Sequence, residues 1–117
     1  MTTTRALIFV NGLLPDLESA RKLVQEGDVL YAADGGASHI LQLGLLPSKV
    51  VGDLDSLKKD ELDLLLTAGV RVVRHPKDKN LTDLELTINS ALEEGHQRFV
   101  IVAALGGRLD MTLSNLN

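Results

Sequence analysis

The chain has 117 residues, of which 44% are hydrophobic and 24% charged, and its formal net charge is −4 at pH 7. This length and composition predict one soluble globular domain with a single core. The acidic balance, the lack of basic clusters and an aromatic content of 3% argue against nucleic acid as a partner. Cysteine is absent, which excludes disulfides and thiolate metal sites and favours a reducing cytoplasm. No signal-peptide pattern opens the chain, and no apolar run reaches the roughly 18 residues that span a bilayer, so no membrane partner is expected.

Strand-like and helix-like patterns alternate along the chain. The predicted strands are short apolar runs, at residues 6–10, 29–33, 50–51, 70–73 and 99–103. The predicted helices have apolar residues at helical spacing, at residues 17–26, 37–43, 57–68 and 83–94. Apolar strands joined through helices are typical of a parallel sheet covered on both faces. We therefore expect an α/β fold, a three-layer α/β/α sandwich on a parallel sheet of five to six strands.

Helix signals and a terminal pattern complete this prediction. Asp16 and Ser56 are expected to cap the first and third helices, and Thr82 with Glu85 forms a capping box for the fourth. Leu109, Leu113 and Leu116 stand at helical spacing, which predicts a last helix that continues to the end of the chain at Asn117.

Unusual polar residues follow each predicted strand. These clusters are Asn11-Gly12, Asp34-Gly35-Gly36, Asp53-Leu54-Asp55-Ser56, residues 75–79, and Gly106-Gly107-Arg108-Leu109-Asp110. Open α/β sheets bind their ligands outside the carboxyl ends of the strands. We therefore expect the clusters to form one site at one edge of the sheet.

The pair Asp53 and Asp55 is the most informative of these clusters. Two carboxylates at the tip of an apolar strand repel each other, and a divalent cation removes that cost. Hard oxygen ligands at this spacing suit Mg²⁺ that carries the phosphates of a nucleotide. The alternative is that both are loop acids that cap the next helix.

The remaining clusters each allow two readings. Asp34 with Gly35 and Gly36 is either a tight turn into a helix or a place where backbone N–H groups approach a phosphate or ribose. Asp83 lies in the first turn of its helix, where the macrodipole favours an acid whatever its function. Lys79 is either a solvated loop residue or a cation that neutralises phosphate charge.

Gly106-Gly107-Arg108 is either a turn with an exposed arginine or a phosphate-facing turn with a guanidinium clamp. None of the three histidines has a partner at metal-ligand spacing. We expect His39 and His96 on helix surfaces and His75 in a loop.

Taken in order, four motifs resemble the catalytic domain of the thiamine pyrophosphokinase family. They are Ala33-Asp34-Gly35-Gly36-Ala37, Gly52-Asp53-Leu54-Asp55-Ser56, Lys79-Asn80-Leu81-Thr82-Asp83 and Gly106-Gly107-Arg108-Leu109-Asp110-Met111. Their order and spacing agree with the family over nearly the whole chain. The resemblance implies an enzyme that transfers pyrophosphate from ATP to the hydroxyl of thiamine, giving thiamine diphosphate and AMP.

The resemblance also implies roles for the residues. Asp53, Asp55 and Asp83 would be the Mg²⁺ ligands, and Asp110 would lie near the transferred group or the accepting hydroxyl. The nucleotide and its phosphates would be surrounded by Asp34, Gly35, Gly36, Ser56, Lys79, Gly106, Gly107 and Arg108. The general base stays open among Asp53, Asp83 and Asp110.

Two residues depart from the family pattern, and so does the length. Asn80 replaces an aspartate and Met111 a histidine. Family members continue into a carboxyl-terminal β-sandwich domain that contributes to thiamine binding and dimerisation, which residues 1–117 do not include. We therefore expect weak Mg-nucleotide binding and little turnover by this chain alone, and a cytoplasmic homodimer for the full-length protein. The family would place the first strand centrally and a sixth strand beyond Asn117.

Two other functions remain open. A pterin pyrophosphokinase would share the acidic metal site and differ in its acceptor pocket. A non-catalytic Mg-nucleotide-binding module would explain Asn80 and Met111 as marks of decay.

Overall fold

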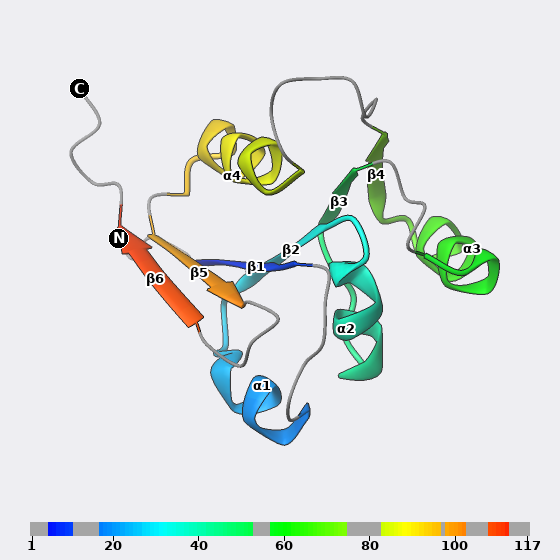
Figure 1. The fold of residues 1–117 in the computed structure, drawn as a ribbon, viewed down its shortest axis with the longest axis horizontal. Coiled ribbons are helices and arrows are strands. Elements are labelled where there is room, and N and C mark those ends of the chain that lie inside the picture. Colours follow the sequence, from blue (N-terminus) through cyan, green and yellow to red (C-terminus); the bar gives the residue numbers. More distant parts are fainter. Residues whose placement is uncertain are drawn as a thin grey trace.

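The computed structural model describes residues 5–10, 17–52, 57–74, 83–96, 98–102 and 108–112, with the backbone alone at 17, 19, 83 and 108–112. Strands and helices alternate until the last two elements (Figure 1). The strands are β1 (Arg5–Phe9), β2 (Val29–Ala33), β3 (Lys49–Gly52), β4 (Arg71–Arg74), β5 (Arg98–Val102) and β6 (Arg108–Thr112). The helices are α1 (Leu17–Leu23), α2 (Gly36–Gln42), α3 (Lys59–Thr67) and α4 (Asp83–Glu93).

The strands form one six-stranded sheet in the order β4-β3-β2-β1-β5-β6. Strands β1 to β5 are parallel, and β6 pairs antiparallel with β5. Helix α4 covers one face of the sheet, and α1, α2 and α3 lie on the other side (Figure 1). The three-layer α/β/α sandwich and the central position of β1 are confirmed.

The prediction for residues 108–112 is wrong. The leucine spacing predicts a helix there, but the segment is strand β6, whose residues pair from Arg98↔Thr112 to Val102↔Arg108. The open edge of β5 offers backbone groups that a strand satisfies and a helix does not. A sixth strand therefore already lies inside the chain, whereas the prediction placed it beyond Asn117. Leu113 and Leu116 lie outside the described residues.

Alternate residues of each strand face opposite layers, which divides the core in two. In β1, Leu7 and Phe9 face α1, α2 and α3, whereas Ala6 and Ile8 face α4. The first cluster also contains Ala20, Ile40 and Leu65, and the second contains Tyr31, Ala91 and Phe99. Strands β1, β2, β3 and β5 are buried along nearly their whole length, on both faces, which explains their apolar sequences.

Helix boundaries differ from the sequence prediction by a few residues. Helix α1 ends at Leu23, and α3 begins at Lys59. The carboxylate of Glu61 accepts a hydrogen bond from the backbone N–H of Lys58 at 3.0 Å, and the Ser38 hydroxyl of α2 donates to the same Glu61 oxygen at 2.9 Å. Glu61 therefore both caps α3 and joins it to α2. The expected caps Asp16, Ser56 and Thr82 lie outside the described residues.

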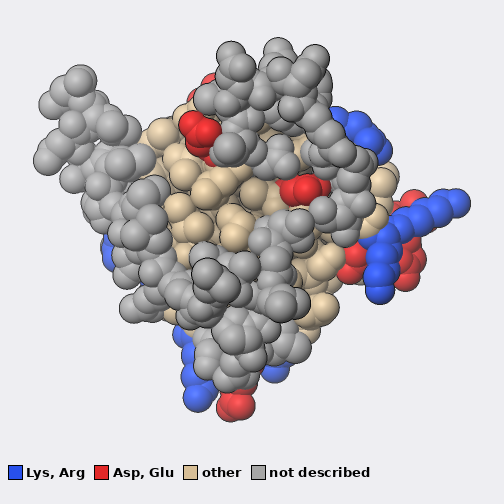
Figure 2. Space-filling view, in the orientation of Figure 1, with Lys and Arg blue, Asp and Glu red and all other residues tan. Residues whose placement is uncertain are grey.

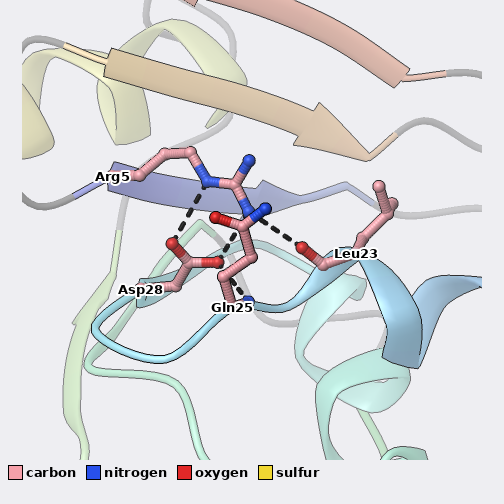
Figure 3. Close-up of polar contacts among 4 residues, drawn as sticks. All are labelled: Arg5, Leu23, Gln25 and Asp28. Atoms are coloured by element: carbon pink, nitrogen blue, oxygen red, sulfur yellow. Dashed lines mark hydrogen bonds and ion pairs between the residues drawn. The ribbon is translucent and has the colours of Figure 1, made fainter.

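An ion pair fixes the amino end of β1 (Figure 3). The Arg5 guanidinium donates to both carboxylate oxygens of Asp28, at 3.1 and 2.8 Å, and to the carbonyl of Leu23 at 2.8 Å. The Asp28 side chain is 4% exposed and also accepts from the backbone of Gln25 at 2.7 Å. This contact ties β1 to the end of α1 and to the turn before β2.

Charge is spread over the described surface. In Figure 2 the described basic side chains lie around the rim of the view, and uncharged residues occupy its centre. No basic patch forms on this face among the residues that the structure describes. Within those same residues, no helix combines the length and the apolar character that crossing a membrane requires.

Candidate functional site at the carboxyl ends of the strands

The register of the sheet brings the carboxyl ends of the central strands to one edge. Phe9 pairs with Ala32 on one side and with Val102 on the other, and Ala33 pairs with Val51. The chain leaves β1 toward one side of the sheet and returns on the other at β5. Such a reversal leaves a crevice outside the strand ends where open α/β sheets bind ligands.

Asp34 occupies a strained backbone conformation at this edge. Its φ is +51°, and among the non-glycine residues that the structure describes it alone has a positive φ. The N–H of Asp34 donates to the carbonyl of Val51 at 2.7 Å, and its own carbonyl accepts from Ala37 at 3.3 Å. Such a conformation costs about 1 kcal/mol, and strain of this kind concentrates at functional sites. The segment is a tight turn into α2, and it is also held directly against the end of β3.

Gly36 lets α2 start against the end of β1. A Cβ at this position would lie 2.0 Å from the carbonyl oxygen of Phe9 and 3.0 Å from the backbone N of Val10. Only glycine therefore fits between the helix and the strand. With Gly35 as the residue before the helix, the backbone of this turn stands at the carboxyl ends of β1 and β3.

The strand that precedes the paired acids ends at the same edge. Gly52 has a φ of +149°, which other residues rarely adopt, and it pairs with Arg74 of β4. Asp53 is the next residue, so the chain enters the paired acids from the edge that Asp34 occupies. Asp53, Asp55 and Ser56 lie outside the described residues, and their roles stay predictions.

Helix α4 brings a third acid to this edge. Lys49 at the start of β3 contacts Ser90 and Glu94, whereas Val51 near its end lines one groove with Leu86. The helix therefore runs antiparallel to β3, and its first residue, Asp83, lies at the carboxyl end of the sheet. The structure describes the backbone of Asp83 only.

The hairpin of β5 and β6 places the last predicted residues. Arg108 pairs with Val102, the last residue of β5, and so stands at the carboxyl edge of the sheet. Asp110 pairs with Val100, two residues farther from that edge. Lys79, Gly106 and Gly107 lie outside the described residues.

The expected Mg²⁺ ligands are oxygen donors of the kind that this cation prefers. Of the three, Asp83 has a described backbone that begins α4 at the proposed edge, and Asp53 directly follows Gly52 there. Within the described residues, no three Asp, Glu or His side chains form a group that could hold a metal. The donor chemistry and these two backbone positions fit Mg²⁺, and the ligand set stays a prediction.

A partly buried polar network at the opposite edge of the sheet was missed by the sequence prediction. The Tyr31 hydroxyl donates to Glu94 Oε1, Lys49 Nζ donates to Ser90 Oγ, and Lys49 Nζ lies 3.2 Å from Glu94 Oε2. Burial and the bond to Glu94 raise the pKa of Tyr31, and that bond also lowers the pKa of Glu94. The available signal was an acid at the carboxyl end of a helix, where the macrodipole disfavours it.

The prediction of a helix-surface position is wrong for His96, and His39 is half-buried in its helix. His96 is 7% exposed, just past the end of α4, and its ring meets the Tyr31 ring edge-on at 5.7 Å. His39 lies in α2 with both ring nitrogens buried, and neither has a hydrogen-bond partner within the described part of the chain. His75 lies outside that part. Packing against the Tyr31 ring, which spacing in the sequence does not report, buries His96.

The fold and the site define a class of protein first. A mainly parallel sheet between helix layers, with a glycine turn and a helix start at the carboxyl ends of its strands, is the architecture of a doubly wound α/β protein. The particular family follows from comparison: the family model for the thiamin pyrophosphokinase catalytic domain matches residues 20–117, and the chain belongs to this family.

Similar proteins agree with this assignment. The chain is 32% identical to thiamine pyrophosphokinase 2 of Arabidopsis thaliana over 136 residues, which cover 98% of this chain and 50% of the relative. It is 30% identical to thiamine pyrophosphokinase of Bacillus subtilis, over 89% of this chain and 47% of the relative. The crystal structure of a Bacillus subtilis thiamine pyrophosphokinase superposes with a TM-score of 0.66 at 28% identity, over 84% of this chain and 46% of that one. The chain thus spans about half the length of the curated relatives that it matches.

Proposed function

We propose that this chain carries the donor site of a thiamine pyrophosphokinase, which transfers pyrophosphate from ATP to the hydroxyl of thiamine. The observation that carries the proposal is the hydrogen bond from Asp34 N–H to the Val51 carbonyl, at 2.7 Å. It holds the glycine turn that would face the nucleotide beside the strand that leads into Asp53 and Asp55. Family membership and the names of the relatives supply the reaction.

In this proposal the chain positions groups and neutralises charge. The N–H groups at the start of α2 face the nucleotide, and Lys79 and Arg108 balance phosphate charge. Asp53, Asp55 and Asp83 hold Mg²⁺, which when bound supplies Lewis-acid stabilisation of the phosphate oxygens. A carboxylate among Asp53, Asp83 and Asp110 accepts the hydroxyl proton as the acceptor oxygen bonds to the β-phosphorus and AMP departs.

The acceptor side is a separate part of the proposal. Because the relatives are about twice as long as the matched region, we propose that thiamine is bound with help from a second, β-sandwich domain. The full-length protein is proposed to be a cytoplasmic homodimer. Residues 1–117 alone would then bind Mg-nucleotide weakly and form little thiamine diphosphate.

The test measures binding and chemistry separately. Titration calorimetry with α,β-methylene-ATP and Mg²⁺ should show binding to the chain, and Asp53→Asn should weaken it at least tenfold. Asp63→Asn is the matched control, because Asp63 is an exposed acid of α3, and it should bind like the parent chain. AMP release and thiamine diphosphate formation should appear with a full-length protein. Absence of binding at saturating Mg²⁺, or equal binding by the two variants, would refute the donor site.

A further inference from the structure

The two elements that lead to the proposed metal ligands are joined to each other at their far ends. Strand β3 begins at Lys49 and leads into Asp53, whereas α4 begins at Asp83 and is followed by Glu94. Lys49 Nζ lies 3.2 Å from Glu94 Oε2 and donates to the hydroxyl of Ser90. The joined ends and the proposed ligands thus lie at opposite ends of the packed pair of β3 and α4.

These contacts are partly buried, and Glu94 is shared between two donors. The Lys49 side chain is 11% exposed and that of Glu94 31%, and Tyr31 beneath them is fully buried. Tyr31 occupies one carboxylate oxygen of Glu94 and Lys49 the other. A buried charge that is held from several sides is costly to displace, because its partners would be left unpaired. Arg71 also approaches Glu94 at 3.6 Å, but its side chain is 67% exposed and adds little.

These polar contacts restrict the movement of α4 along its own axis. Leu84, Ile88 and Leu92 pack on the sheet through apolar contacts, and the hydrophobic effect that drives such packing is non-directional. A slip of α4 by one residue moves it about 1.5 Å along its axis. Hydrogen bonds do not survive such a change in donor–acceptor distance. The Lys49 contacts therefore oppose a shift of the helix along its axis.

We propose that Lys49 and Glu94 are positioning residues for the metal site. By locking the end of α4 to the start of β3, they set where Asp83 lies relative to the carboxyl end of β3. The helix transmits this position rigidly over its 11 residues, about 16 Å. The effect on metal binding rests on the proposed function, in which Asp53, Asp55 and Asp83 are the expected ligands. The effect of Lys49 and Glu94 on the position of α4 does not depend on metal binding.

The chain contains a matched control for the test. The ion pair between Arg5 and Asp28 is also buried, with side chains 13% and 4% exposed, and it too lies at the amino end of a strand (Figure 3). It joins β1 to the turn before β2, and neither strand leads into an expected Mg²⁺ ligand. Breaking it should therefore cost stability without moving α4.

The experiment compares Lys49→Met and Glu94→Gln with Arg5→Met in the 117-residue chain. Urea unfolding gives the stability of each variant, and electron paramagnetic resonance gives the affinity for Mn²⁺, used as the probe cation, with α,β-methylene-ATP present. We expect Lys49→Met and Glu94→Gln to weaken Mn²⁺ binding about tenfold with nucleotide binding in the absence of metal unchanged. Arg5→Met should keep the Mn²⁺ affinity within twofold at a similar loss of stability. If Lys49→Met does not fold, Glu94→Gln still tests the proposal, because its amide oxygen remains an acceptor for the Tyr31 hydroxyl.

A second readout separates this proposal from the proposed function. Backbone amide chemical shifts of residues 84–86, far from both substitutions, should move in Lys49→Met and Glu94→Gln and stay unchanged in Arg5→Met. If the parent chain binds no Mn²⁺ but these shifts move as expected, the proposed function fails and the positioning of α4 stands. If the shifts stay unchanged, or if Mn²⁺ affinity falls equally in all three variants, the positioning role is refuted.

Discussion

Replacing Gly36 by alanine tests how closely α2 must approach the end of β1. The added Cβ would lie 2.0 Å from the Phe9 carbonyl oxygen and 2.5 Å from its carbonyl carbon, where real Cβ atoms stay beyond 3.0 Å. Both atoms are backbone, so no side chain can rotate away. Either α2 or β1 must therefore shift by about 1 Å, and both are packed in the same core cluster.

The expected loss of stability in Gly36→Ala is the balance of two opposing effects. Overpacking a tight interior site costs about 1–3 kcal/mol, and the fixed backbone places this position at the upper end. Alanine returns at most about 1 kcal/mol through its helix propensity and the less disordered unfolded chain. The net expectation is a loss of about 2 kcal/mol, out of a total of about 5–15 kcal/mol for a domain. Because α2 also carries the glycine turn, nucleotide affinity should fall as well.

The assay is urea unfolding followed by circular dichroism, with Gly44→Ala as the matched control. Gly44 lies just past the end of the same helix, has a φ of +79°, and would have no atom within 4 Å of an added Cβ. Its replacement should cost about 1 kcal/mol from backbone strain alone. If Gly36→Ala were no more destabilising than Gly44→Ala, the close approach of α2 to β1 would be wrong.

Three further predictions use the same unfolding assay. Asp34→Gly should relieve the strain at φ +51° and stabilise the chain by up to about 1 kcal/mol. Both Asp34→Gly and Asp34→Asn should lower nucleotide affinity in calorimetry. Full affinity in Asp34→Asn would exclude a role for the charge. The bond from Tyr31 lowers the folded pKa of Glu94, so its stabilisation is present above the ordinary glutamate pKa of about 4.3 and is lost as pH falls through the lowered value. Glu94→Gln should flatten that acid limb of stability against pH, and a profile that superimposes on that of the parent chain would contradict the assignment. Leu65→Ala should cost about 2–5 kcal/mol of stability, because this side chain of α3 is fully buried. Leu64, its neighbour, is 53% exposed, so Leu64→Ala should change stability by no more than about 0.5 kcal/mol. Equal costs would mean that α3 packs on another face.

Much of the candidate site was predictable because it depends on order along the chain. Strand β2 has the predicted bounds, and α4 begins at the predicted Asp83. Once alternating apolar strands and helices predict a parallel sheet, the carboxyl ends of its strands must meet at one edge. That order predicts Asp34 and the paired acids at the same edge of the sheet, and the structure adds that Asp34 lies beside the end of β3. The side-chain roles of Asp53, Asp55, Ser56, Lys79 and the other undescribed residues stay predictions.

The sequence by itself determined the α/β class, the central strand and the family, because local patterns and linked motifs are written along the chain. Only the tertiary structure decided that residues 108–112 form a strand, since the open edge of β5, and not the spacing of their leucines, determines their partner. It alone buried His96 against Tyr31 and joined Lys49 to Glu94 across 45 positions of sequence. Such contacts depend on which elements are neighbours in space. The hydrophobic periodicity of the sequence predicts each helix or strand separately and does not show which of them will be neighbours.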